Sequence, residues 1–453
     1  MSSSLSDTLP DKNSRTFGVS DAQGPAQMTL GPERERRLWW KIDFRLVPMI
    51  SLMYLFSFMD RGNAKLEGLT TQLHLTGSRY NVALVSGIMA STRHVFLTKL
   101  NVVRVLHSKL SPTIKLAWGV IMTFMGLVKS YPQLVAMRFL LGVAEAGFYP
   151  GVTFYLSMWY PRLQIDLSFS PLYWCSSSSG YGHPVADRII QGLATIVICF
   201  VGALVLADYP DTARFLSPEE RQFVEQQRTL DIEEEGKGTV TQHILSAFTD
   251  WQVWAMGFVL MSFDVPIYGI TFFLPFGYNT AISQLLTVPV YVAATLFMIT
   301  AAHFSDTMKI RFPFIIASEI VGLVGYIIQI TDASTGVKYF GTYLVVIGIY
   351  TGIPCVVGWL ANNLHGKYKR GAGTALQVGM GNLGGIIASY IFRTQDEPRY
   401  VLGFAIEIGF LCMGMIVTAF SAYAYHRANT ARIARAKRDG INEAKYAVDI
   451  YAI

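Results

Sequence analysis

Residues 134–158 read LVAMRFLLGVAEAGFYPGVTFYLSM, an apolar run whose only charged side chains are Arg138 and Glu145. A helix crosses the hydrocarbon core of a bilayer with roughly 20 mostly apolar residues, because each residue advances it by about 1.5 Å. Backbone groups in lipid must be hydrogen-bonded within their own segment, so a long apolar run is read as a helix. The segment is therefore predicted to span a membrane.

The composition of the whole chain agrees with this prediction. The 453 residues are 52% hydrophobic and only 15% charged, whereas a soluble domain carries roughly 25% charged residues. This excludes a disordered chain, a collagen, a disulfide scaffold and a nucleic-acid binder. The four cysteines have neither metal-ligand spacing nor the pattern of a disulfide framework. We predict one membrane-embedded body with no metal and no cofactor.

Eleven apolar runs are long enough to be candidate spans, so the predicted class is an all-α membrane protein. They cover residues 43–59, 80–100 (the weakest), 113–130, 134–158, 189–207, 251–275, 284–303, 312–330, 338–361, 371–392 and 400–425.

A polar segment at 208–249 divides these runs into five before it and six after it. It is predicted to be a solvated linker with a helix that starts at Ser217-Pro218, with the serine as N-cap and the proline as the first helical residue. Two bundles of six helices are typical of a transporter. The sequence therefore predicts two six-helix bundles with about 11–12 membrane helices, and with the fifth span degraded or missing.

Basic residues flank the first and last spans, and the tendency of cytosolic loops to be basic places both tails in the cytosol. Two cytosolic tails require an even number of spans, so one span is hidden or lost. The gap lies at 163–188, which is rich in serine, and 86–108 is also a poor span. The predicted organisation is a disordered cytosolic tail at 1–39, bundles at 40–207 and 250–426 around the cytosolic linker 208–249, and a basic cytosolic tail at 427–453.

Charged residues inside the spans are the strongest candidates for function, because burying a charge in a bilayer is costly. Asp60 and Arg61 close the first run, and Arg138 and Glu145 lie about two helical turns apart on one face of the fourth. Such acid–base pairs can exchange partners, carry a proton and release a guanidinium to a substrate anion. Alternatively, Asp60-Arg61 is an interfacial helix stop and Arg138–Glu145 is a structural salt bridge.

Two polar residues of the run 371–392, Gln377 and Asn382, either line a substrate path or only bond a neighbouring helix. The same run contains the pattern G-x-G-x-x-G at 379–384. A dinucleotide site needs that pattern between a strand and a helix, so inside a membrane run it carries no weight. Nothing in the sequence indicates an enzyme.

The chain resembles the fungal anion:cation symporter branch of the major facilitator superfamily, which includes allantoate, nicotinic acid, pantothenate and biotin transporters. The resemblance covers most of 40–426. It is carried by LMYLFSFMDRGNAKLEGL, MRFLLGVAEAGFYPGVTFYLSMWYPR, YPDTARFLSPEER and WLANNLHGKYKRGAGTALQVGMGNLGGIIASYIFR.

The resemblance implies the major facilitator fold and proton-coupled symport of a small organic anion (a carboxylate, vitamin or ureide) by alternating access. The membrane is the plasma membrane or an organelle membrane. The resemblance assigns Asp60 and Glu145 to proton coupling, and Arg138 to pairing with these acids. It assigns Arg61 to the anion and Asn382 to the substrate cavity. Gln377 is a candidate substrate contact from its polarity in an apolar run alone. The expected partners are the anion, the proton and the lipid bilayer.

Residues 86–108 and 163–188 depart from the family pattern between well-matched flanks. Our hypothesis is that exon-boundary or reading-frame differences produced them. If they are real, the alternative function is a transport-incompetent membrane protein, either a nutrient sensor or a non-functional product.

Overall fold

The computed structural model describes most of the chain outside the two termini. The described residues are 31–62, 86–87, 118–121, 123–125, 127–145, 152, 155, 159, 185–206, 210, 213–233, 239–272, 280–308, 310–364, 366–392, 396 and 400–439. Every regular element within these ranges is a helix.

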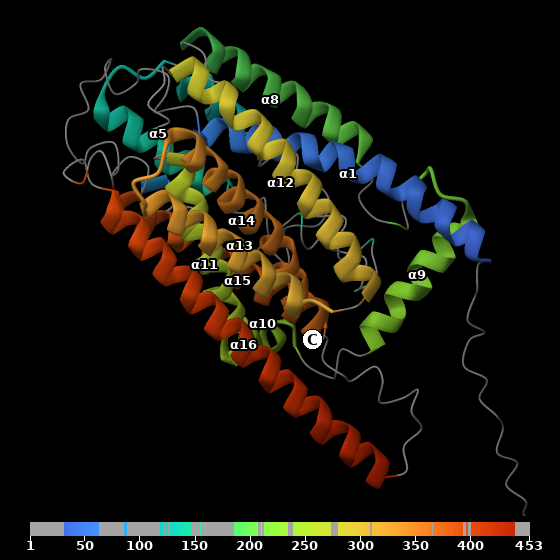
Figure 1. The fold of residues 1–453 in the computed structure, drawn as a ribbon. Coiled ribbons are helices and arrows are strands. Elements are labelled where there is room, and N and C mark those ends of the chain that lie inside the picture. Colours follow the sequence, from blue (N-terminus) through green and yellow to red (C-terminus); the bar gives the residue numbers. More distant parts are fainter. Residues whose placement is uncertain are drawn as a thin grey trace, which may run out of the picture.

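The C-terminal half is a bundle of long helices (Figure 1). Its members are α11 (Trp251–Phe272), α12 (Thr280–Met308), α13 (Phe312–Ile330), α14 (Thr335–Asn363), α15 (Lys367–Ile391) and α16 (Val401–Arg438). Helix α11 packs against α14, α15 and α16, and α13 packs against α14 and α16. The core between them is built on fully buried side chains, among them Phe263, Tyr326, Ile349 and Trp359.

In the N-terminal half, α1 (Pro32–Gly62) and α8 (Val185–Val205) pack against each other, and α5 (Tyr131–Glu145) lies near one end of this pair (Figure 1). Gly202 allows the contact between α1 and α8, because a Cβ there would lie 2.9 Å from the Met53 methyl carbon. The predicted span at 80–100 and the gap at 163–188 lie mostly outside the described residues, and the predicted span at 113–130 is described at 118–121, 123–125 and 127–130.

The central linker contains two helices, α9 (Pro218–Glu233) and α10 (Val240–Thr249). The predicted start of α9 is confirmed. The Glu220 amide donates to the Ser217 hydroxyl at 3.2 Å, and the Ser217 amide donates to the Glu220 carboxylate at 2.8 Å. This reciprocal capping box satisfies backbone donors that have no partner within the helix.

The prediction of a disordered tail as far as residue 39 is wrong for its last part, since α1 begins at Pro32. Proline is suited to the first helical position. Glu33 and Glu35 lie in the first turn, where their negative charges stabilise the positive end of the helix dipole. Leu38 is buried in the core, so packing as well as local sequence holds these first turns.

Glycines bring α13 and α14 close together. A Cβ at Gly348 would lie 2.6 Å from the Ser318 carbonyl oxygen, and one at Gly325 would lie 2.6 Å from the Val345 nitrogen. Small residues that let backbones approach are the usual means of packing helices in membranes.

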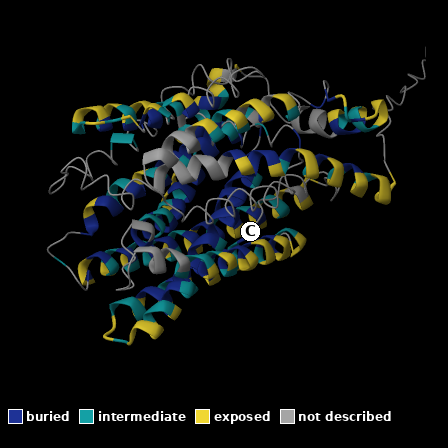
Figure 2. Ribbon diagram, turned by 90° about the horizontal axis from the view of Figure 1, so that it is seen from above, coloured by how far each residue is buried: buried dark blue, intermediate teal, exposed yellow. Residues whose placement is uncertain are grey.

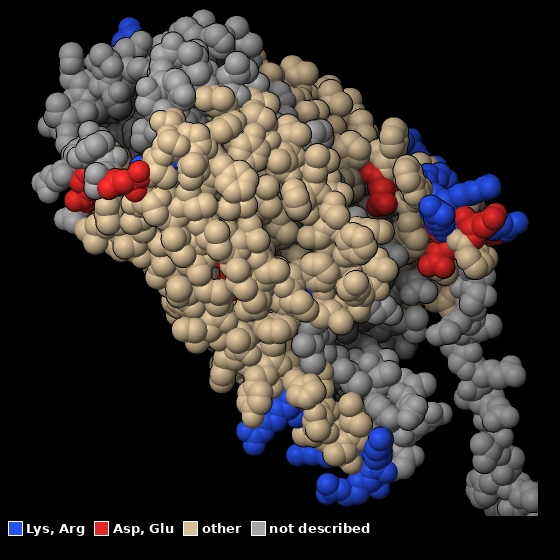
Figure 3. Space-filling model, viewed as in Figure 1, with Lys and Arg blue, Asp and Glu red and all other residues tan. Residues whose placement is uncertain are grey.

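The surface of the bundle suits a lipid environment. Among the residues that the structure describes, five helices are long and apolar enough to cross a membrane, all of them after residue 250. Tyr131–Ala144 and Leu193–Gly202 are shorter apolar helices of the described N-terminal part. Phe297, Phe420 and Ile416 are apolar and more than half exposed, and Figure 2 shows exposed residues along the outer helices. Figure 3 shows charged side chains gathered at the ends of the molecule, with a broad uncharged band between them.

Candidate functional site

Arg138 lies in the middle of α5 and is buried, with 6% of its surface exposed. Helix α5 ends at Glu145, so the two predicted partners belong to one continuous helix. Their seven-residue separation places both on one face, about 10 Å apart along the axis. The side chain of Glu145 lies outside the described residues.

Asp60 and Arg61 belong to the last turn of α1, which ends at Gly62. The helix therefore continues through both residues, which lie at the end of α1 opposite its basic start. Their side chains lie outside the described residues.

Gln377 of α15 is fully buried and connects three helices. Its Nε2 donates to the carbonyl oxygens of Met256 in α11 and Val356 in α14, each at 3.3 Å. Its Oε1 is buried and has no hydrogen-bond partner within the described part of the chain. The side chain thus fixes α15 against its neighbours and keeps one free acceptor.

Asn382, five residues further along α15, is only partly buried. Its Oδ1 accepts a hydrogen bond of 3.5 Å from the Tyr268 hydroxyl of α11. The adjacent Gly381 approaches the carboxylate of Asp264, which is also partly buried. Here α11 and α15 present an amide, a phenol and a carboxylate close together. This is the polar group within the C-terminal bundle best suited to a small polar ligand.

Two buried acids of the C-terminal bundle were not predicted from the sequence as site residues. Glu319 of α13 and Glu407 of α16 are fully buried. Ser262 Oγ lies 3.5 Å from Glu319 Oε1, within donating distance. A Cβ added at Gly269 would overlap the Glu407 carboxylate, so the two lie in close contact. Each acid is the only charged residue of an apolar run. A charge in an apolar run is also the pattern by which Asp60 and Glu145 were predicted, so the same pattern could have identified both acids.

A buried ion pair links the last turns of α12 to Arg311, the residue just before α13. Arg311 Nη2 lies 2.7 Å from Asp306 Oδ1, and Arg311 is 2% exposed. Burial lowers the pKa of Arg311 to about 10, so the guanidinium remains charged at neutral pH.

The glycine pattern 379–384 lies in the interior of α15. A dinucleotide site places this pattern in the turn from a strand into a helix. Residues 379–384 therefore serve helix packing, as the contact of Gly384 with Val265 illustrates: a Cβ there would lie 2.9 Å from the valine side chain.

Comparison with known proteins agrees with this architecture. Residues 112–389 match the family model of the Major Facilitator Superfamily. The chain belongs to the major facilitator superfamily. An uncharacterised transporter of Schizosaccharomyces pombe is 30% identical over 451 residues, which cover 91% of this chain and 89% of that protein. A high-affinity nicotinic acid transporter of Saccharomyces cerevisiae is 28% identical over 422 residues, covering 87% and 79%.

The fold of a major facilitator transporter is also supported by a solved structure. A proton:xylose symporter of the superfamily superposes with a TM-score of 0.65 at 16% identity, covering 83% of this chain and 94% of that one. The predicted all-α major facilitator fold and the resemblance to the branch of the nicotinic acid transporters are therefore confirmed. As a member of this superfamily, the chain is a multi-pass integral membrane transporter.

Proposed function

We propose that this transporter carries a small organic anion together with a proton by alternating access. The observation that carries the proposal is the burial of Arg138 inside the apolar helix α5, with Glu145 two turns away on the same face. A buried guanidinium grips a carboxylate through paired hydrogen bonds and keeps its charge. The similarity to a high-affinity nicotinic acid transporter favours a carboxylate as the substrate class.

In this proposal Glu145 and Asp60 take up and release the coupled proton, and Arg138 pairs with whichever acid is ionised. Arg61 binds the substrate anion. Asn382 contributes a polar contact from the C-terminal bundle, beside Tyr268 and Asp264, and Gln377 fixes α15 against α11 and α14. The bundles 40–207 and 250–426 then rock about a central cavity in the plasma membrane, with both tails in the cytosol.

Uptake into proteoliposomes tests the coupling. Purified protein is reconstituted with an inwardly directed proton gradient, and accumulation is measured with labelled nicotinate, allantoate, pantothenate and biotin as separate probes. Glu145→Gln should abolish accumulation but retain exchange of the transported anion. Glu219→Gln, an exposed change in the linker helix α9, is the matched control. If Glu145→Gln accumulates substrate as the parent does, the coupling role of Glu145 is wrong.

A transport-incompetent membrane protein is the second candidate. Among the described residues, all five helices of full membrane-spanning length and apolarity follow residue 250, and the apolar helices found before it are shorter. Labelling of cysteines introduced into each tail separates the two candidates. Tails on the same side, together with uptake of any probe, support transport, whereas tails on opposite sides without uptake support the second candidate.

A further inference from the structure

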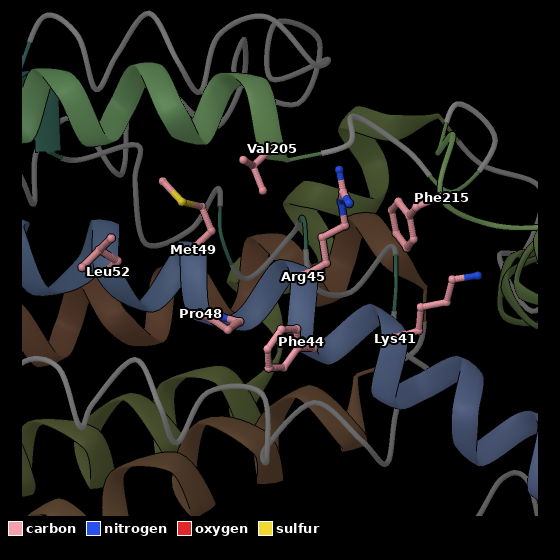
Figure 4. A pocket seen from close by; sticks show the side chains of 8 residues that line it. All are labelled: Lys41, Phe44, Arg45, Pro48, Met49, Leu52, Val205 and Phe215. Atoms are coloured by element: carbon pink, nitrogen blue, oxygen red, sulfur yellow. The ribbon is translucent and has the colours of Figure 1, made fainter.

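A pocket of about 570 Å³ opens beside the basic end of α1, away from the charges assigned to transport. Figure 4 shows its lining: α1 supplies most of the side chains, Val205 comes from the end of α8, and Phe215 comes from the segment before α9. Six of its eight lining residues are apolar, and the other two are the cations Lys41 and Arg45.

The lining residues of α1 change from positively charged to apolar along the helix. Lys41, Arg45, Pro48 and Leu52 follow spacings of four, three and four residues, so they lie on one face. The two cations are at the outer end, and Pro48 and Leu52 lie on the side of the apolar span. From Arg45 to Leu52 the helix rises about 10 Å. The pocket therefore has a positive head and an apolar floor.

Arg45 is the cation best placed to take a ligand. It is exposed, its guanidinium carbon lies 5.0 Å above the Phe215 ring, and none of its donors is bonded within the described part of the chain. Lys41 Nζ lies 2.9 Å from Glu220 Oε2, which offsets part of its charge. An ammonium has three donors, so Lys41 can still bond a second anion.

The surroundings of the pocket belong to a membrane interface. Trp40 next to Lys41 is 65% exposed and Phe44 is 79% exposed, and tryptophan is enriched where hydrocarbon meets headgroups. Arg34 and Arg37 lie in the preceding turns of α1. Basic residues beside a membrane helix attract anionic lipids.

We propose that this pocket binds an anionic glycerophospholipid. The phosphate and a second acidic group of the headgroup bond Arg45 and Lys41, and an acyl chain lies along Pro48 and Leu52. Charge complementarity selects the headgroup, and the apolar floor explains why a lipid fits better than a soluble anion. Because Lys41 also holds Glu220, the bound lipid lies at the contact between the first helix and the linker.

Native mass spectrometry of the full-length protein tests this proposal. The detergent-purified protein is incubated with equal amounts of dioleoylphosphatidylserine and dioleoylphosphatidylcholine, and the ratio of bound lipids is measured. The parent should retain phosphatidylserine preferentially. Arg45→Gln should lower this preference roughly fivefold, since one cation near a membrane surface contributes about that factor. Arg45→Lys, which keeps the charge, should preserve most of it.

Arg36→Gln is the matched control, because nine residues turn a helix by about 180° and Arg36 lies on the face opposite Arg45. It should leave the preference unchanged, and excess inorganic phosphate should not displace the lipid. The proposal is overturned if the parent shows no preference, if Arg36→Gln acts as strongly as Arg45→Gln, or if phosphate displaces the lipid, which would indicate a site for soluble anions. Gel filtration of each variant shows that it is folded.

Discussion

Arg311 and Asp306 form a buried ion pair across the turn that joins α12 to α13, with 2.7 Å between Nη2 and Oδ1. Ser305 reinforces the turn, since its hydroxyl donates to the Ile310 carbonyl oxygen at 3.0 Å. Two charges removed from water must be matched to each other, because a single unpaired buried charge costs far more than the pair contributes.

Replacing Arg311 by Gln should therefore destabilise the protein by about 3–5 kcal/mol, because Asp306 would be left buried without its cation. The double variant Arg311→Gln/Asp306→Asn should lose clearly less than the sum of the two single variants. Thermal unfolding in detergent, followed by gel filtration with fluorescence detection, measures the three values. Additive losses would contradict the coupling.

Gly348 is predicted to tolerate no side chain. Gly348→Ala should cost about 1–3 kcal/mol, because the new Cβ would lie 2.6 Å from the Ser318 carbonyl oxygen and would push α14 away from α13. Gly336→Ala is the matched control in the same helix, since nothing lies within 4 Å of a Cβ at that position. Equal thermal stability of the two variants would show that the close approach of the helices is not required.

Substitutions of Gln377 and Asn382 should change different properties: the stability of the protein for Gln377 and the KM of uptake for Asn382. Gln377→Leu should lower stability by about 1–3 kcal/mol through loss of its hydrogen bonds to α11 and α14, with little change in KM. Asn382→Ala should raise the KM of uptake about tenfold and leave stability nearly unchanged, because its bond to Tyr268 is long and partly exposed. A raised KM for Gln377→Leu at normal stability would instead assign Gln377 to the substrate.

The contact between α1 and α9 should depend on pH through Glu220. Burial alone would raise the pKa of Glu220, but hydrogen bonds from Lys41 and Ser217 and the charge of Lys41 hold it below 4.5. A lowered carboxyl pKa stabilises the folded contact above pH 4.5, and this stabilisation is lost as the pH falls through the folded-state pKa. The pair is partly exposed, so its contribution is below about 1 kcal/mol.

Hydrogen exchange of the α9 amides measures this dependence. After correction for intrinsic rates, protection should be constant from pH 8 to pH 5 and should fall below pH 4.5. Glu220→Gln should remove the change, whereas Glu219→Gln, which lies outside the pair, should keep it. Protection that already falls between pH 7 and pH 5 would contradict the assignment to Glu220.

The sequence by itself determined the class of the protein, because the length and polarity of its apolar runs admit only membrane helices. The expected run 312–330 coincides with α13, and the cap at Ser217 fixed the start of α9. The superfamily followed from motifs that contain Asp60, Arg61, Arg138 and Glu145. These features are local or repeat with the period of a helix, so they can be identified from residues that are close together in the sequence.

Only the tertiary structure decided which faces meet. Helical spacing places Gln377 on a face of α15 but does not say that Met256 and Val356 lie opposite it. The sequence around Arg311 indicates a turn and not a buried ion pair, and the lipid pocket joins side chains from α1 to Phe215 of the linker. Packing partners come from distant parts of the chain. Their choice depends on how whole helix surfaces fit, which no local pattern encodes.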